Sequence, residues 1–528
     1  MVVWLTWKRR VQQETEKRFA SERGCQPLRP WSAKWPLGLD LLLKAFTYAR
    51  RGQILHYFLK IVEQSGTTFQ QNLLGGRGVN TVDPANIEAI LSTNFNDYSL
   101  GLRAPNFQPV LGSGIFTQDG AAWRHSRQLL RPRFASNRVH NFEQVQKCVE
   151  HLIESIPGDG IVDLQPLFFK LTFDTTMFLL FGNSVNSADW GQVAGQESKF
   201  AQAFNLSQEY LSHRGRLGPF YWLLNDKAFR DACKTCHGFM DNGIAKALEA
   251  FAQTDHGGKT EDRDADTYVF VEALMQQTRD PRVLRDQCLN VLLAGRDTTA
   301  CCLHWTFRLL ARHQHILDKL RREIDQISGL GSSAPLPTRE DLRRMSYLQL
   351  VIKEGMPSSA LISPIFAISA HNTKIQSNGK IVLRLYPSVP VNSREAIRLT
   401  TLPVGGGPDG KSPVLVRPGE GVGYCVYAMH RRKDIYGQDA EEFRPERWEG
   451  DSLRDIGWAY LPFNGGPRLC LGQEFALLEV AYTVARLVQV FPKIELPRGE
   501  REVKVGQERQ ILTLVVASAE GCVVSLKD

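Results

Sequence analysis

The chain has 528 residues, a net charge of +8 and 43% hydrophobic residues, which allows a large core and excludes an overall disordered protein. The basic excess comes without a basic stripe, stacking aromatics or a known nucleic-acid module, so an acidic protein or an anionic membrane surface suits it better than nucleic acid. Ten cysteines at ordinary density exclude a small disulfide-stapled fold and predict reduced, mostly buried thiols in a cytosol-facing protein.

The N-terminus carries a short apolar run, Val2–Trp7, followed by the basic residues 8–10. A bilayer span takes about twenty apolar residues, and the order of apolar run and charge excludes a signal peptide. Two interpretations stay open: an ordinary short tail, or the end of a membrane anchor that begins upstream in the gene. Three prolines in 26–38 predict a linker, so we expect a tail over 1–35 and one domain over 36–528.

The remaining elements follow in chain order. An amphipathic helix is expected over 39–64, and "TVDPANIEAIL" predicts a short strand and then a helix that begins at Pro84. Residues 98–120 are rich in Gly and Pro and predict loop, and several helices follow to about residue 325. Short strands and turns are expected after residue 386, interrupted by a final helix in "GQEFALLEVAYTVARLVQVF". The prediction is a mostly α fold with a minor β portion late in the chain.

The stretch "FNGGPRLCLGQEFALLEVA" places Cys470 in a Gly-rich loop just before that final helix. The helix N-terminus and nearby backbone N–H groups stabilise a thiolate. Gly466 permits a tight turn close to a flat ligand, Arg468 supplies a cation for a carboxylate, and Phe463 supplies an apolar shield. A lone loop cysteine is more often structural, but the spacing F-x-x-G-x-R-x-C-x-G, completed by Gly472, is met at every position. On these residues the chain resembles the cytochrome P450 superfamily, the haem-thiolate monooxygenases.

The resemblance implies a single-domain cytochrome P450 fold with haem b between two helices and Cys470 as the sulfur ligand of the iron, which favours O–O cleavage. In "GAAWRHSRQLLRPRF", Trp123 and Arg127 lie four apart and therefore on one helix face. Their family counterparts meet the haem propionates. In "LNVLLAGRDTTACCLHWTF", the acid Asp297 stands beside the alcohol Thr298, a pair that can relay protons during oxygen activation.

One helix of the family pattern, E-x-x-R, is interrupted. "LRLYPSVPVNSR" supplies Arg384, while "SYLQLVIKE" ends at Glu354, and removal of Gly355–Ile381 places the two residues three apart. In the family this pair joins a buried ion network with the arginine of "FRPERW", here Arg447. The 27 residues span whole codons, and their ends can encode the boundaries of a small fungal intron, so we interpret 355–381 as a retained intron. The alternative is a real insertion loop, which would split a buried ion network.

Two further patterns look like chemistry and are rejected. "REAIRL" contains Glu395 and Arg398 at E-x-x-R spacing but follows the proline-rich tail, where strand and loop are expected. "ACKTCHGF" fits a covalent haem-attachment pattern at Cys233, Cys236 and His237, but it lies in a strongly helical run far from the other haem features.

The implied activity is insertion of one oxygen atom of O₂ into a C–H bond of a lipophilic substrate, with electrons from NADPH through NADPH–cytochrome P450 reductase, docking on the basic face near Cys470. "AGRDTTA", "PVNSR", "LPVGGGPDG" and "YAMHRRKDIYGQDAEEFRPERW" resemble the fungal n-alkane and fatty-acid hydroxylases. Long-chain alkanes or fatty acids are therefore the expected substrates. The alternatives are a lipophilic secondary metabolite, or an inactive haem- or ligand-binding relic if 355–381 is translated.

Family carry-over places substrate contacts in loop 98–120, in the region Phe204–Trp222, and at Val389 and Val391. The expected location is the cytosolic face of the endoplasmic reticulum membrane.

Overall fold

The computed structural model describes residues 2–31, 34–135, 138–156, 160–182, 194–256, 270–353, 383–500 and 503–527. The described residues form two compact units, each assembled from three stretches of chain. The sheet unit comprises Met1–Gly101, Lys353–Cys470 and Val503–Ile511. The helical unit comprises Leu102–Ile352, Leu471–Glu502 and Leu512–Asp528.

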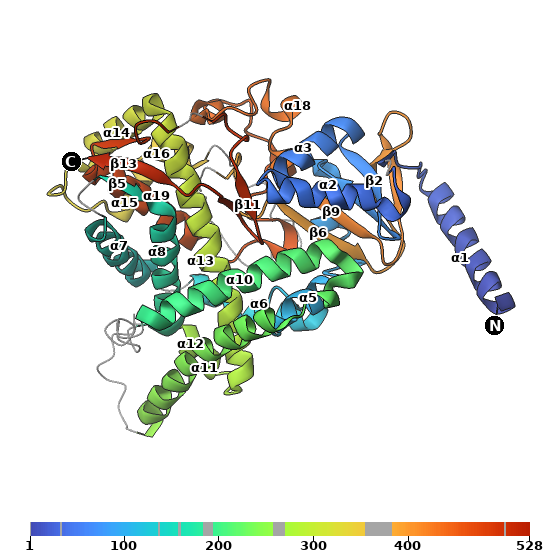
Figure 1. The fold of residues 1–528 in the computed structure, drawn as a ribbon, viewed down its shortest axis with the longest axis horizontal. Coiled ribbons are helices and arrows are strands. Elements are labelled where there is room, and N and C mark those ends of the chain that lie inside the picture. Colours follow the sequence, from blue (N-terminus) through green and yellow to red (C-terminus); the bar gives the residue numbers. More distant parts are fainter. Residues whose placement is uncertain are drawn as a thin grey trace, which may run out of the picture. The chain divides into compact units, whose positions relative to one another are not determined.

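The sheet unit is built on a six-stranded mixed sheet in the order β1-β2-β3-β9-β6-β4 (Figure 1). β3 pairs parallel with β9, and β9 pairs antiparallel with β6, so a segment near residue 80 lies beside one near residue 422. A separate hairpin joins β7 to β8. The strands are β1 (Pro30–Trp31), β2 (Thr68–Leu73), β3 (Gly76–Thr81), β4 (Tyr98–Ser99), β6 (Val391–Ala396), β7 (Thr400–Gly406), β8 (Ser412–Val416) and β9 (Gly421–Cys425).

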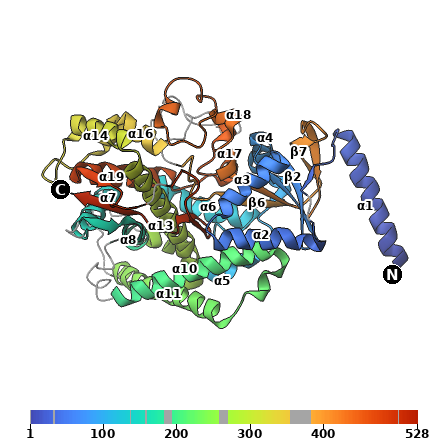
Figure 2. The same ribbon diagram turned by 45° about the horizontal axis from the view of Figure 1, so that its top comes forward.

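Helices α2 and α3 pack on each other and on β2 in both ribbon views (Figures 1 and 2). Apolar side chains of the strands and of α4 form one buried cluster that includes Val79, Ile87 and Val422. The most N-terminal helix, α1, is largely exposed. Among the described residues, no helix combines the length and the apolar character needed to cross a bilayer. The helices of this unit are α1 (Val2–Glu22), α2 (Leu39–Arg50), α3 (Ile54–Ser65), α4 (Pro84–Glu88), α17 (Val426–Met429) and α18 (Lys433–Tyr436).

The helical unit is organised around α13, the longest of its described helices, which packs along α8 and also contacts α11 and α19. Its core is rich in aromatic side chains, including Phe173, Phe200 and Phe239. The helices are α5 (Arg103–Leu111), α6 (Gly120–Ala135), α7 (Arg138–Glu154), α8 (Leu164–Phe181), α10 (Ala194–Leu217), α11 (Lys227–His256), α12 (Phe270–Met275), α13 (Pro281–Arg312), α14 (Gln314–Ser328), α15 (Arg339–Arg344), α16 (Ser346–Lys353) and α19 (Gln473–Val490).

Short strands complete the chain. β10 (Lys493–Glu495), β13 (Val523–Lys527) and β5 (Ile161–Asp163) form a three-stranded antiparallel sheet in the helical unit. β11 (Gln510–Leu512) and β12 (Val516–Ser518) follow the final helix. The predicted mostly α fold with a late β portion is confirmed, although β2 and β3 show that strands also occur early.

Two element predictions were wrong in detail. The helix expected over 39–64 is two helices, because Gly52 adopts a positive φ of 68° between α2 and α3 and ends the first. The stretch 98–120, predicted as loop, contains the nine-residue helix α5. Pro105 falls in its first turn, where a backbone N–H has no helical partner to lose. Pro109 lies inside the helix and cannot donate to the Pro105 carbonyl, which accepts instead from the Arg214 guanidinium at 3.4 Å. The helix expected at Pro84 is confirmed, and Asp83 caps it by accepting the Ala85 N–H.

Candidate active site

Cys470 ends a compact turn in the sheet unit. Its backbone N–H donates to the Phe463 carbonyl at 3.0 Å, which closes the segment between the two residues. Of the ten cysteines, Cys470 is the exposed one; seven are buried, and Cys25 and Cys425 are half-buried. The expected pattern of mostly buried, reduced thiols is confirmed. The exposed thiol in the loop is therefore the cysteine best placed to bind a group from outside the protein.

The residues between Phe463 and Cys470 require particular backbone shapes. Asn464 has a positive φ of 60°, and its side chain donates to the Arg468 carbonyl and accepts from the Tyr424 hydroxyl. Gly466 has a φ of 62°, and a Cβ there would lie 1.9 Å from the Leu91 carbonyl oxygen. Gly466 is thus required by both its backbone conformation and the closeness of Leu91. Arg468 is half-buried at the end of the short 3₁₀ turn Gly466–Arg468.

A buried histidine, His430, connects this loop to Arg384. The His430 Nε2 accepts the Leu461 backbone N–H at 2.9 Å, so the other ring nitrogen, Nδ1, carries the proton and donates to the Arg384 carbonyl at 3.2 Å. Burial and the nearby Arg384 guanidinium lower the pKa of His430 to about 3, which keeps the ring neutral. Its ring also stacks on Tyr460 with centroids 4.9 Å apart. Sequence reasoning missed His430, although it stands in the quoted stretch "YAMHRRKD".

Arg384 and Arg447 converge on the same backbone segment. The fully buried Arg384 donates to the carbonyls of His430 and Glu442 at 2.8 and 3.0 Å. Arg447 donates to the Glu442 carbonyl and forms an ion pair with Asp439 at 3.2 Å. The structure therefore brings two members of the expected network together and adds Asp439, which sequence reasoning missed. The third expected member, Glu354, and the proposed insertion 355–381 lie outside the described residues.

In the helical unit, α13 carries the acid–alcohol pair. Asp297 is 2% exposed, and its Oδ1 accepts from the Arg296 guanidinium at 2.7 Å. Burial raises the pKa of Asp297, while Arg296 and a hydrogen bond from Gln208 of α10 act to lower it. The Thr298 hydroxyl donates to the Ala294 carbonyl one turn earlier in the helix, at 2.7 Å. Burial therefore favours the neutral form of the Asp297 carboxyl more than water does, against the opposing effect of Arg296.

Arg296 is the second residue that sequence reasoning passed over, although it lies inside "AGRDTT". Its guanidinium also donates to the Asn205 side chain of α10 and lies over the Phe169 ring at 4.9 Å. The Arg296 carbonyl accepts from the Thr172 hydroxyl of α8. These contacts fix the backbone next to Asp297 from two neighbouring helices.

The other expected site residues are placed as follows. Trp123 is buried on α6, and the Arg127 guanidinium lies 5.9 Å from its ring, so the expected shared helix face is confirmed. Gly472 caps α19 in the helical unit. Val389 is 37% exposed, and Val391 begins β6 in the sheet unit.

The two rejected patterns also lie where expected: Glu395 is in β6, and Cys236 is fully buried within α11.

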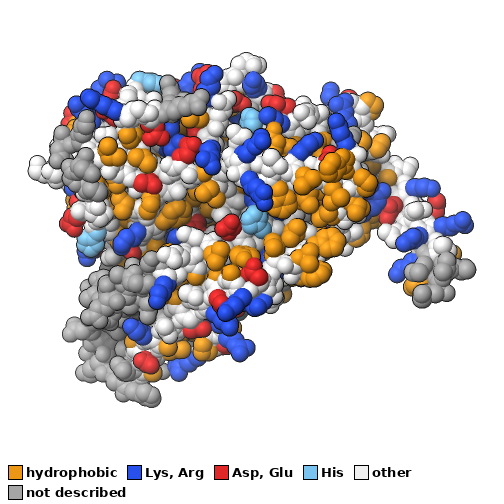
Figure 3. Space-filling view, in the orientation of Figure 1, with side chains coloured by type: hydrophobic (Ala, Val, Ile, Leu, Met, Phe, Trp, Pro, Cys, Tyr) orange, Lys and Arg blue, Asp and Glu red, His pale blue; other side chains and the backbone are white. Residues whose placement is uncertain are grey.

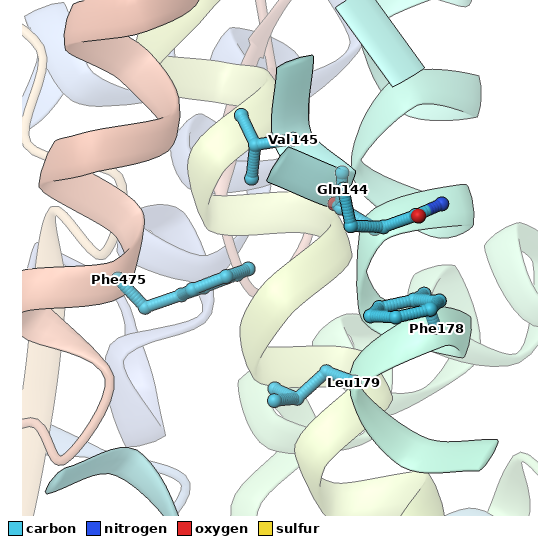
Figure 4. A pocket seen from close by; sticks show the side chains of 6 residues that line it. Gln144, Val145, Phe178, Leu179 and Phe475 are labelled. Atoms are coloured by element: carbon cyan, nitrogen blue, oxygen red, sulfur yellow. The ribbon is translucent and has the colours of Figure 1, made fainter. Parts of the chain in front are cut away.

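A small recess lies between α7, α8 and α19, and it is too narrow to hold a water molecule. Phe475 extends from α19 toward Phe178 and Leu179 of α8, and Gln144 and Val145 close it from α7 (Figure 4). No predicted site residue of the described chain is among its lining residues. The recess is therefore too small for a substrate.

The residues present fit a haem. An exposed thiol follows a turn that glycine alone can form at residue 466, and the neighbouring Arg468 supplies the cation that a propionate requires. In the helical unit, a buried carboxyl adjoins a hydroxyl on α13. Each unit, taken by itself, therefore offers one kind of group that a haem-thiolate oxygenase uses: a thiol in the sheet unit and a buried carboxyl in the helical unit.

Comparison with known proteins agrees with that class. The cytochrome P450 family model matches residues 34–357 and 382–517, so the chain belongs to the cytochrome P450 family. A protein named cytochrome P450 from Arthroderma benhamiae is 57% identical over 98% of this chain and 95% of its own length. Cytochrome P450 52A13 from Debaryomyces hansenii is 41% identical over 91% of this chain and 88% of its own. Cytochrome P450 52A5 from Candida maltosa is 44% identical over 81% and 77%, respectively.

The protein is therefore a monooxygenase that uses haem b and receives electrons, derived from NADPH, through a redox partner.

Proposed function

We propose that this monooxygenase hydroxylates long-chain aliphatic substrates, alkanes or fatty acids, with haem b held by the Cys470 thiolate. The motifs quoted above resemble the fungal alkane and fatty-acid hydroxylases, and proteins named cytochrome P450 52A are over 40% identical to most of this chain. When bound, haem supplies the oxidising chemistry that inserts one atom of O₂ into a C–H bond while the other leaves as water. The observation that carries the proposal is the exposed Cys470 within its closed, glycine-dependent turn.

The chain's own residues have three proposed tasks. Cys470 binds the iron, and Arg468, Trp123 and Arg127 bind the haem carboxylates. Asp297 holds a proton in a site shielded from water and passes it on through the Thr298 hydroxyl. The turn residues Phe463, Gly466 and Gly472 shape the backbone around the ligand. Val389 and Val391 are proposed substrate contacts, as are residues of 98–120 and of Phe204–Trp222.

We further propose a membrane-bound enzyme on the cytosolic face of the endoplasmic reticulum that receives electrons from NADPH–cytochrome P450 reductase. In the sheet unit, large apolar side chains are exposed near the start of α2, where Figure 3 shows hydrophobic side chains gathered: Trp35, Leu37, Leu39 and Leu43. On α1, Trp4 and Trp7 are 57% and 62% exposed next to a basic run. In the helical unit, Phe220, Trp222 and Leu223 are exposed together. Aromatic residues beside basic ones suit an interface with anionic lipid.

The proposal extends to the gene. The family match stops at residue 357 and resumes at Val382, which supports our interpretation of 355–381 as a retained intron within the domain 36–528, after a tail over 1–35. Sequencing the mature transcript across codons 354–382 tests this directly: absence of the 27 codons supports the interpretation, and their presence in all transcripts overturns it.

The proposed function is tested by spectroscopy on the purified full chain. We expect the reduced protein with carbon monoxide to show a thiolate-type absorption band, which Cys470→Ser abolishes and Cys25→Ser, at a half-buried cysteine, retains. Titration with a long-chain fatty acid should shift the Soret band, and turnover with reductase and NADPH should give hydroxylated product. A thiolate band without binding or turnover of any alkane or fatty acid would refute the substrate class, and absence of the band in wild type would refute the haem site.

A further inference from the structure

The connection between α5 and α6, residues 112–119, is held by side chains of α13. We call it the connecting loop. The Ser113 N–H donates to Asp286 Oδ2 at 2.8 Å, and the Phe116 N–H donates to Asn290 Oδ1 at 3.0 Å. The Asn290 amide also donates to the Leu111 carbonyl at 2.9 Å. Two residues one turn apart on α13 thus satisfy two backbone N–H groups of the loop and the carbonyl of Leu111, the last residue of α5.

The loop approaches α13 more closely than any side chain would allow. A Cβ at Gly112 would lie 2.0 Å from the Asp286 carboxyl carbon, and Gly112 also has a positive φ of 58°. A Cβ at Gly114 would lie 2.3 Å from the Asn290 amide nitrogen. Each glycine therefore lies directly against one polar side chain of α13: Gly112 against Asp286 and Gly114 against Asn290. A larger residue at either glycine would displace that side chain.

A third α13 residue reaches the end of the loop through α6. Gln287 donates to the Ser126 hydroxyl at 2.8 Å, and Ser126 donates to Gln118 Oε1 at 2.6 Å. Within the loop, the Thr117 hydroxyl donates to the Gly112 carbonyl. The loop is consequently fixed at its beginning, middle and end.

The holding residues are buried, so their hydrogen bonds are worth more than surface ones. Asn290 is fully buried, and Asp286 is 8% exposed, with its second oxygen paired to Arg285 at 3.1 Å. Removing one partner from such a buried pair leaves the other unsatisfied, which costs more than the loss of a solvent-exposed hydrogen bond. Between the fixed points, Ile115 and Phe116 pack against the core of the helical unit.

α13 also carries Asp297, seven residues beyond Asn290 and on the same helix face. The rise of an α-helix places the two about 10 Å apart along its axis. One rigid helix thus fixes both the acid that we propose to handle protons and the loop that we propose to contact substrate.

We propose that Asp286 and Asn290 are positioning residues that fix the connecting loop and thereby set which carbon of an aliphatic chain is hydroxylated. This inference rests on the proposed function, because it takes the connecting loop as part of the substrate wall. The two side chains act through the loop backbone and contact no reacting atom.

The test compares Asp286→Ala and Asn290→Ala in the full, haem-loaded chain. We expect each to raise the fatty-acid dissociation constant about tenfold, equivalent to one lost buried hydrogen bond, and to change the ratio of terminal to subterminal products. The thiolate-type band with carbon monoxide should persist. Asp286→Asn, which keeps an acceptor for the Ser113 N–H, should restore the wild-type product ratio. Asp241→Asn is the matched control, because it removes the other carboxylate of Arg285 without touching the loop.

Two further measurements cover variants that fold poorly. Gly114→Ala should alter the product ratio as Asn290→Ala does, and the double variant should be no worse than either, since alanine at 290 makes room for the new methyl group. Hydrogen exchange at the Ser113 amide should accelerate in Asp286→Ala, and exchange at the Phe116 amide should accelerate in Asn290→Ala. Neither amide should exchange faster in Asp286→Asn or in Asp241→Asn.

Unchanged exchange, or faster exchange with an unchanged product ratio and dissociation constant, overturns the inference. If wild type binds and hydroxylates no alkane or fatty acid, the proposed substrate class fails instead. Exchange at the two amides then decides by itself whether the side chains hold the loop.

Discussion

Glu479 of α19 is the clearest case of a buried acid with a measurable cost. It is 1% exposed, and its Oε1 accepts from the Thr175 hydroxyl of α8 at 2.5 Å. Burial raises the pKa of Glu479 from 4.5 to about 8, with the Thr175 hydrogen bond opposing the rise. Other ionisable groups near it on the packed helices are Cys148 of α7 and, beyond it, Asp174 of α8 with its partner Lys170.

The sign of the pH effect follows from the direction of the shift. Because the folded protein binds this proton more tightly than the unfolded chain, stability is lost as pH rises from about 4.5 to about 8 and is constant above that. A neutral isostere, Glu479→Gln, removes the loss while keeping an acceptor for Thr175. Each pKa unit is worth 1.36 kcal/mol, so the stability gained by the variant should grow by about 3 kcal/mol between pH 5.5 and 8.5.

The assay is chemical denaturation of the haem-loaded wild type and variant at pH 5.5, 7.0 and 8.5. Glu474→Gln serves as the control, because Glu474 lies on the same helix but is exposed. It should show no matching growth with pH. If the difference in unfolding free energy between Glu479→Gln and wild type stays constant across the three pH values, the buried Glu479 carboxyl does not titrate between pH 5.5 and 8.5.

Three further perturbations follow from the site geometry. Gly466→Ala should abolish haem retention, because the new methyl group meets the Leu91 carbonyl; Gly457→Ala, which adds the same backbone strain with open space around it, should retain haem. His430→Leu should lower the free energy of unfolding by about 3 kcal/mol, because two buried backbone partners lose their hydrogen bonds; a smaller loss than in an exposed-site control such as His315→Leu would contradict this. Asp297→Asn should slow product formation about a hundredfold with an unchanged carbon monoxide spectrum, and unchanged turnover would remove Asp297 from the proton path.

The sequence predicts the proposed functional residues better than it predicts the residues that hold their backbone in place. Cys470, Asp297 and Trp123 are visible as motifs because their spacing along the chain is short. His430 is not, since its two partners lie 31 and 46 residues away and are backbone groups, which leave no mark on residue type. Asp286 and Asn290 are hidden for the same reason: they bind backbone groups of a loop more than 170 residues earlier.

The fold shows the same division. The sequence located α19 as the final helix, and it predicted α13 only as part of a helical run that ends near residue 325. It missed α5, whose two prolines resemble loop composition, and it could not show that β3 pairs with β9, more than 300 residues later in the chain. Pairing over such distances is decided by packing within the unit and not by local propensity.

The insertion provides the sharpest remaining test. The His430 ring links Arg384 to Leu461, two residues before Phe463 in the loop that ends at Cys470, so any displacement of Arg384 is transmitted to the ligand turn. Deletion of residues 355–381 places Glu354 three residues before Arg384, on the same face of a helix, where it can join Arg447. Deletion of 355–382 is the matched control, because it moves Glu354 to the opposite face. We expect the first deletion to raise haem content and thermal stability above those of the full chain and the second to do neither. Equal behaviour of the two deletions, or full haem content and turnover in the chain as written, would show that 355–381 is a tolerated loop and that Arg384 is held without Glu354.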